Sequence, residues 1–315
     1  MVFDKKIEDL DNHFREEHDF INLKKKIDNW FTTIDDDRDK EIYLQMLEKY
    51  RFYSRKNIIC TCRKLHEKVT SFDSEVETTI FLPMLSPDGR SNHSFEIHNI
   101  YREANRLNKK CFPADINTVI NTYPLDQINN ICFVDDMTGS GRTIKESIRN
   151  IFKKNLELAT KNIYILLMEV PEEIDRIEKA IQSEVSDNIK ILYVNLHEKA
   201  LKEGNLFKGK ELKEVKQRLE KYEKLVNKNN RRDMFGFDKS EFLLSFYYDT
   251  PNNTISSLWK HRKGWEPPFN RGTSSVHNPS WIDNIISDEK GAKSLKSRVK
   301  NRKELNYNAK ILRNR

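Results

Sequence analysis

The stretch from Ile131 to Thr143 constrains this chain more than any other. It opens with four apolar residues, Ile131 to Val134, a run that is too short for a buried helix. Such a run is typical of a strand buried on both faces of a parallel sheet. Two carboxylates, Asp135 and Asp136, follow directly, and a polar turn then leads into a helical pattern. The stretch therefore predicts a strand, an acid pair, a turn and a helix in direct succession.

The turn contains the residue types that hold a phosphate. Its members are Thr138, Gly139, Ser140, Gly141, Arg142 and Thr143. Backbone N–H groups and hydroxyls at a helix N-terminus form an anion cradle, which the helix dipole favours. Glycines let the backbone approach a ligand closely, and the acid pair can accept hydrogen bonds from two neighbouring sugar hydroxyls. The plainer alternative is a strand–turn–helix unit with an acidic cap.

Further strands are predicted from apolar segments at 78–85, 161–168, 189–196 and 241–248. Helical patterns separate most of them, which is typical of a parallel α/β sheet. Ligands of such sheets bind outside the carboxyl ends of the strands, which is where Asp135 falls. We therefore expect a doubly wound, mostly parallel, five-stranded sheet. Helical spacing of apolar residues over 1–75 predicts a helical region before it.

Length and composition set the broad class. A chain of 315 residues can form one large domain or two ordinary ones. We find no apolar run of membrane-spanning length, and Met1 to Lys6 lacks the apolar core of a signal peptide. The four cysteines show neither metal-ligand spacing nor a disulfide framework. We therefore expect a soluble, cytoplasmic protein that does not associate with membranes.

The net charge of +7 is unevenly distributed. Residues 290–315 contain ten Lys and Arg residues against one acid, Glu304. We expect three regions: helices over 1–75, a central domain over 76–272 and a basic tail over 273–315. The tail is either a solvated, partly disordered segment or a docking segment for nucleic acid or for an acidic partner protein.

The stretch from Ile131 to Thr143 resembles the phosphoribosyl-diphosphate (PRPP) binding motif of type I phosphoribosyltransferases. Asp135 and Asp136 match the acid pair of that motif, and the run from Ser140 to Thr143 matches its loop. The resemblance implies a sheet of the type I phosphoribosyltransferase kind. It also implies that the two aspartates are catalytic and orient the 2′- and 3′-hydroxyls, directly or through Mg²⁺. The segment Thr138 to Thr143 would hold the 5′-phosphate.

Two positions depart from the commonest form of the motif. Thr138 stands where an apolar residue is usual, and Gly139 stands where Thr or Asp is usual. The resemblance also gives a role to the polar loop from Ser86 to His93, because these enzymes hold pyrophosphate on a loop between a strand and a helix. Arg90 and Ser91 are the candidates there, with an ordinary turn as the alternative.

The segment after the last predicted strand resembles the end of the phosphoribosyltransferase-like effector domain of bacterial conflict, or antiviral defence, systems. It contains Pro-Asn-Asn-Thr at 251–254, then Trp259, then a Trp-x-Pro-x-Phe-x-Arg ending at Arg271. The likeness covers most of residues 25–272. It makes Arg271 a candidate for pyrophosphate binding, whereas turn formation and a surface salt bridge would also account for this segment.

Three hypotheses remain open at this point. The first is a phosphoribosyltransferase-like enzyme that binds PRPP or a related nucleotide with Mg²⁺ and serves as a toxic defence effector. The second is a catalytically inactive module that senses a nucleotide and regulates a partner. The third is a nucleic-acid-binding component, for which the basic tail would contact RNA, DNA, or a protein or nucleoprotein of a defence operon.

Overall fold

The computed structural model describes residues 2–18, 20–72, 76–87, 92–228 and 230–272. Internal contacts divide the chain into Met1–Arg271 and Gly272–Arg315. Every element described below lies in the first unit. The predicted basic tail, 273–315, lies outside the described residues.

The central sheet has four parallel strands that lie side by side in chain order. They are β2 (Thr79–Pro83), β3 (Asn130–Met137), β4 (Asn162–Pro171) and β5 (Ile189–His197). Successive side chains of β3 point to opposite faces, so Ile131 and Phe133 join one apolar cluster while Cys132 and Val134 join another. This two-sided burial explains the continuous apolar run in the sequence.

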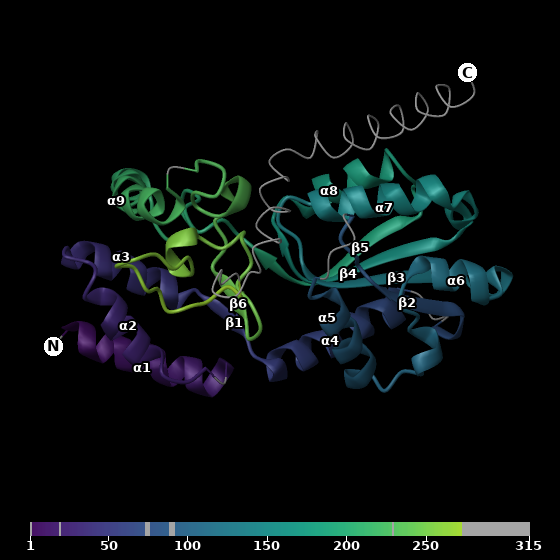
Figure 1. Cartoon of the computed structure of the whole chain (residues 1–315), viewed down its shortest axis with the longest axis horizontal. Coiled ribbons are helices and arrows are strands. Elements are labelled where there is room, and N and C mark those ends of the chain that lie inside the picture. The colour runs from purple at the N-terminus through teal and green to yellow at the C-terminus, as the bar shows by residue number, and fades with distance from the viewer. Residues whose placement is uncertain (1, 19, 73–75, 88–91, 229, 273–315) are drawn as a thin grey trace, which may run out of the picture. The chain divides into compact units, whose positions relative to one another are not determined.

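Helices cover both faces of this sheet (Figure 1). One face carries α4 (Arg55–Phe72) and α5 (Ser94–Ala104), and the other carries α6 (Ile116–Thr122), α7 (Arg142–Lys154) and α8 (Ile174–Gln182). In α7, Ile144, Ile148 and Phe152 are buried at intervals of one helical turn, which confirms the amphipathic pattern predicted there.

The predicted five-stranded sheet is divided in two among the described residues. The fifth predicted strand is shortened to β6 (Leu244–Phe246), and it pairs in parallel with β1 (Arg51–Tyr53) as a separate two-stranded sheet. The N–H of Arg51 also donates to the carbonyl of Leu243 at 2.9 Å. Because each strand is only three residues long, neither could show a period of two, and β1 lies in a region predicted to be helical.

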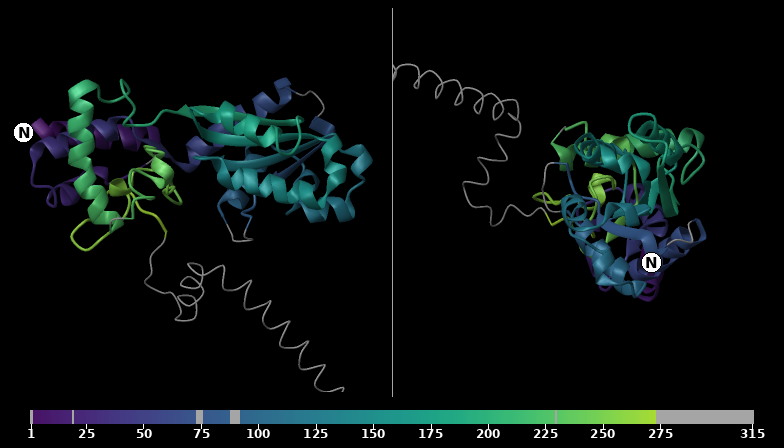
Figure 2. Two further views of the ribbon diagram at one scale, coloured as in Figure 1. Left: turned by 90° about the horizontal axis from the view of Figure 1, so that it is seen from above. Right: turned by 90° about the vertical axis from the view of Figure 1, so that its right-hand side faces the viewer.

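The remaining helices form a second apolar core with the end of the described chain. They are α1 (Val2–His18), α2 (Leu23–Phe31), α3 (Asp37–Glu48) and α9 (Gly209–Asn227). The carboxylate of Asp36 accepts a hydrogen bond of 2.8 Å from the N–H of Arg38 and so caps α3. Trp30 and Trp265 meet edge to face at 5.6 Å. Figure 2 shows α9 running across the N-terminal helices, over this core.

A buried carboxylate joins the two sheets. Glu169 of β4 is fully buried, and both of its oxygens lie 2.5 Å from Nη1 of Arg51. The hydroxyl of Tyr53 and Nδ1 of His197 also donate to it. The backbone N–H of Leu243 donates to Nε2 of His197 at 3.0 Å, so the ring proton sits on Nδ1 and faces Glu169. This network fixes β1 and β6 against the carboxyl ends of β4 and β5.

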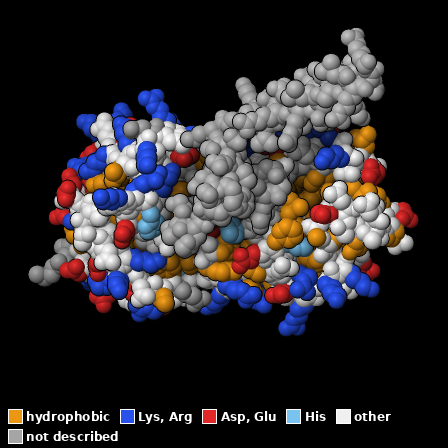
Figure 3. All heavy atoms as spheres, in the orientation of Figure 1, with side chains coloured by type: hydrophobic (Ala, Val, Ile, Leu, Met, Phe, Trp, Pro, Cys, Tyr) orange, Lys and Arg blue, Asp and Glu red, His pale blue; other side chains and the backbone are white. Residues whose placement is uncertain are grey.

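The surface mixes both signs of charge, as the face in Figure 3 shows. Helix α9 alone contributes six Lys and Arg residues and three Glu residues to this surface, whereas its fourth glutamate, Glu223, is buried. Every helix among the described residues is too short or too polar to cross a membrane.

Candidate functional site

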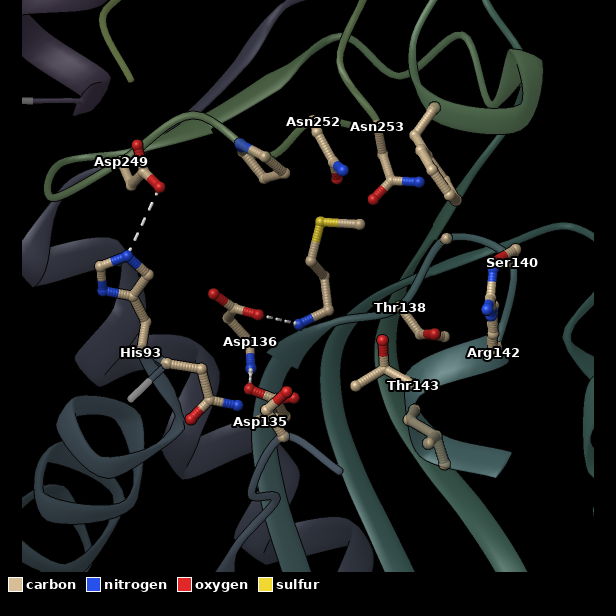
Figure 4. A pocket seen from close by; sticks show the side chains of 18 of the residues that line it. His93, Asp135, Asp136, Thr138, Ser140, Arg142, Thr143, Asp249, Asn252 and Asn253 are labelled. Atoms are coloured by element: carbon tan, nitrogen blue, oxygen red, sulfur yellow. Dashed lines mark hydrogen bonds and ion pairs between the residues drawn. The ribbon is translucent and has the colours of Figure 1, made fainter. Parts of the chain in front are cut away.

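A cavity of about 500 Å³ lies at the carboxyl end of β3. Its main walls are the end of β3, the turn into α7, the loop before α5 and the loop after β6, and Phe237 and Arg271 complete the lining. Figure 4 shows the acid pair on one side of the cavity and Asn252 and Asn253 on the opposite side. The position matches the rule that parallel sheets bind ligands beyond their strand ends.

The acid pair belongs to β3 itself, which runs to Met137 rather than ending at Val134. Asp135 is 9% exposed, and one of its oxygens accepts a hydrogen bond of 3.0 Å from the N–H of Asp136. The carboxylate of Asp136 accepts from the N–H of Met137 at 2.7 Å and from the hydroxyl of Tyr248 at 2.8 Å. The pair is thus held by backbone groups and one phenol, within the sheet rather than on a free strand end.

The electrostatics of the pair favour a cation. Burial raises the pKa of Asp135 well above its ordinary value, and the charge of Asp136 raises it further. Burial also raises the pKa of Asp136, against a lowering by the Tyr248 hydrogen bond. No group of three or more His, Cys, Asp and Glu side chains in the described part of the chain could hold a metal. Two adjacent carboxylates fit Mg²⁺, which commonly takes one or two carboxylates and completes its shell with waters and substrate phosphates.

The turn from Thr138 to Gly141 presents backbone to the cavity. Thr138 is anchored by its N–H, which donates to the carbonyl of Glu169 at 3.2 Å. Gly141 adopts φ +72° and stands directly before α7. No described side chain caps the first turn of α7, so its leading N–H groups are available to an anion. Ser140 and Thr143, both exposed, add hydroxyls.

The other predicted site residues have different surroundings. Arg142 lines the cavity, but its Nε donates to Glu146 at 3.0 Å. Arg271 also lines it, with Nη1 donating to the carbonyl of Thr250 at 2.9 Å and its guanidinium over the ring of Trp259. Arg90 and Ser91 lie outside the described residues. The residues flanking them, Ser86, Pro87, Asn92 and His93, line the cavity.

One wall of the cavity consists of aromatic and ionisable side chains that sequence reasoning did not assign. His93 stacks on Tyr248 with ring centroids 4.4 Å apart, and its Nε2 lies 3.4 Å from Oδ2 of Asp249. The hydrogen bond with Asp249 raises the pKa of His93, against a smaller lowering by burial. A protonated imidazole at this place adds to the positive charge that Arg142 and Arg271 bring to the cavity.

The loop after β6 supplies the wall opposite the acids. Pro251, Asn252 and Asn253 line the cavity, and Phe237 joins them from the preceding loop. The sequence signal of Asn252 and Asn253 was similar to that of Asp135, namely polar residues shortly after a predicted strand. Asn and Pro are also common turn formers, so composition alone could not separate the two roles.

Fold and site together define a parallel α/β protein in which an acidic strand end and a Gly/Ser/Thr turn at a helix N-terminus line one cavity. The family model PRTase-CE matches residues 27–271. The chain therefore belongs to this phosphoribosyltransferase-like family. No curated protein and no solved structure shows significant similarity to it.

Proposed function

We propose that this chain is a phosphoribosyltransferase-like enzyme that binds PRPP or a related nucleotide with Mg²⁺. The observation that carries the proposal is the meeting of Asp135, Asp136, the turn before α7 and Arg271 in one cavity. We further propose that it acts in the cytoplasm, from the composition described above, and that it is the toxic effector of a bacterial antiviral defence system, from the sequence resemblance.

The proposed reaction breaks the bond between ribose C1 and a pyrophosphate oxygen. Pyrophosphate leaves with the bonding electrons, the lone pair of an acceptor base or of water forms the new bond to C1, and the acceptor's proton passes to solvent. Such a reaction requires positioning and charge stabilisation more than a covalent nucleophile. Bound Mg²⁺ would supply positive charge against the pyrophosphate oxygens.

Each part of the cavity has a role in this scheme. Asp135 and Asp136 would hold Mg²⁺ and orient the ribose hydroxyls. The backbone of the turn from Thr138 to Thr143 would bind the 5′-phosphate. Arg271 and a protonated His93 would face the pyrophosphate, and we propose the same role for Arg90 and Ser91.

The test is Mg²⁺-dependent release of pyrophosphate from PRPP, measured on the full chain beside an Asp135→Asn/Asp136→Asn variant. We expect the double variant to lose activity while keeping its fold. Asp126→Asn, which changes an exposed acid on the connection before β3, is the matched control and should retain activity.

Metabolite profiling of cells that express the wild type and the double variant would then identify the acceptor. A folded double variant with full activity would exclude the site assignment. Tight binding of PRPP without turnover would favour the regulatory nucleotide sensor instead.

A further inference from the structure

Asn253, which lines the cavity, is wedged between two glycines, one on the turn before α7 and the other on the loop that precedes β6. A Cβ atom added to Gly139, on the turn before α7, would lie 2.0 Å from Nδ2 of Asn253. A Cβ atom added to Gly236 would lie 2.1 Å from the backbone oxygen of Asn253. In protein structures, Cβ atoms essentially never lie within 3.0 Å of a non-bonded atom from elsewhere in the chain. Neither position can therefore carry a side chain while Asn253 keeps its place against the turn.

The loop that faces Asn253 adopts an unusual backbone. Between positions 235 and 241, four residues other than glycine have positive φ: Phe235, Asp238, Lys239 and Glu241. Conformations of this kind persist only where the surroundings hold them, and they concentrate at functional sites. Here the N–H of Phe237 donates to the carbonyl of Asn252 at 2.7 Å. The N–H of Phe242 donates to the carbonyl of Asn253 at 3.0 Å. These hydrogen bonds fix the loop at 235–241 against Asn252 and Asn253.

The carboxamide of Asn253 keeps unused hydrogen-bonding capacity. Its Nδ2 donates to Oγ of the buried Ser240 at 3.1 Å, and that same Oγ lies 2.9 Å from the Asn253 carbonyl. An amide group has a second N–H and a carbonyl oxygen with two lone pairs. Among the described residues neither of these has a partner. Figure 4 shows the Asn253 side chain at the cavity, above the turn that carries Thr138 and Ser140.

We propose that Asn253 is a specificity-determining residue that donates its free N–H to a phosphate bound on the turn from Thr138 to Thr143. This inference rests on the proposed function, in which the turn binds the 5′-phosphate, and adds to it a side-chain donor from the loop after β6 that recognises this phosphate. A neutral amide suits the place, because it can donate to a phosphate dianion, whereas a carboxylate of the same shape would repel it.

Asn253→Asp tests the proposal, because it keeps the shape of the side chain and adds a negative charge. Ribose 5-phosphate reports on the phosphate turn, and pyrophosphate with Mg²⁺ reports on the acid pair. In calorimetry with the full chain, we expect Asn253→Asp to bind ribose 5-phosphate at least tenfold more weakly and Mg²⁺-pyrophosphate as tightly as the wild type. Asn252→Asp, which places the same charge one residue away on the cavity wall, should have the smaller effect on ribose 5-phosphate.

Gly139→Ala provides an independent test of the proposal. The added Cβ would displace the carboxamide of Asn253 from the turn, while the chemistry of Asn253 stays the same. It should also weaken binding of ribose 5-phosphate. Equal affinity of the wild type and Asn253→Asp for ribose 5-phosphate would overturn the inference, as would an equal loss of both ligands, which would mark a structural role. A wild type that binds neither ligand would instead overturn the proposed function itself.

Discussion

The hydroxyl of Tyr248 donates a hydrogen bond of 2.8 Å to Oδ2 of Asp136. This contact ties the loop after β6 to the acid pair at the end of β3, which lies 112 positions earlier in the chain. Because burial raises the pKa of Asp136 and this hydrogen bond lowers it, Tyr248 helps to keep the carboxylate ionised. An ionised pair is the form that binds a divalent cation.

Tyr248→Phe should therefore weaken the response to Mg²⁺. A hydrogen bond to a charged group contributes about 1.5–3 kcal/mol, which corresponds to at least a tenfold rise in the Mg²⁺ concentration needed for half-maximal pyrophosphate release. Tyr247→Phe is the control, since the hydroxyl of this exposed neighbour bonds to Glu96 instead. An unchanged Mg²⁺ requirement in Tyr248→Phe would show that Asp136 does not depend on the phenol.

Gly141→Val should destabilise the protein and abolish binding of ribose 5-phosphate. A β-branched residue at φ +72° costs about 1–3 kcal/mol, and a Cβ there would lie 2.4 Å from Cγ2 of Ile177, adding an overpacking cost of about 1–3 kcal/mol. Gly264→Val provides a matched control, because Gly264 has φ +76° and open space around it.

Urea unfolding would separate the two costs in these glycine variants. Backbone strain should lower the free energy of unfolding in both variants. Any further decrease in Gly141→Val relative to Gly264→Val should measure the collision with Ile177. Only Gly141→Val should affect the ligand. Equal stability of the two variants would mean that Ile177 moves aside freely.

The features that could be predicted from sequence are those set by neighbouring residues. The run from Ile131 to Val134 predicts a buried strand because each residue contributes an apolar side chain to one face or the other. The acids and the turn follow at once, so the general rule for parallel sheets places them together at the strand ends. The helix start at Asp36 was also predictable, because capping depends on residues two positions apart.

Features that depend on distant pairing could not be predicted. The partner of β6 is β1, nearly two hundred residues away, and three-residue strands carry no periodic signal. The position of Asn253 depends on two glycines, Gly139 and Gly236, that are remote from each other in sequence. In isolation each looks like a loop residue, and only their common neighbour in space reveals why a side chain is excluded.

The basic tail supports a prediction that rests on sequence alone. Deleting 290–315 removes ten Lys and Arg residues and one acid. If six of these charges contact phosphates of a single strand, log K should fall with log salt at a slope of about −4. We expect the truncated protein to lose nucleic-acid or partner binding while its PRPP affinity stays the same.

Filter binding across a salt series would measure this effect of the tail. A full-length variant with Gln in place of the ten basic residues controls for the length of the chain and should behave like the truncation. Undiminished binding by the truncated protein would assign any nucleic-acid contact to the rest of the chain.

Glu169 should govern how the free energy of unfolding depends on pH in the acidic range. Burial alone would raise its pKa, but the hydrogen bond from His197 and the charge of Arg51 outweigh it, and the pKa lies below the ordinary value of 4.5. A carboxyl whose folded-state pKa is lowered contributes stability above its unfolded-state pKa and loses that contribution as pH falls through the folded-state value. The wild type should therefore lose stability below about pH 4.5.

Glu169→Gln should reduce the free energy of unfolding at pH 7 by about 1.5–3 kcal/mol, because it removes the charged acceptor of the hydrogen bonds from Tyr53 and His197, and should flatten the acid side of the stability curve. Glu184→Gln is the control: Glu184 also has a lowered pKa and two cationic partners, but its carboxylate is open to solvent. Urea unfolding between about pH 3 and pH 8 gives both curves over the range in which the loss is expected. An acid slope that is the same in Glu169→Gln as in the wild type would mean that other carboxylates set the acid limit. If Glu184→Gln flattened it instead, the surface pair would carry the effect.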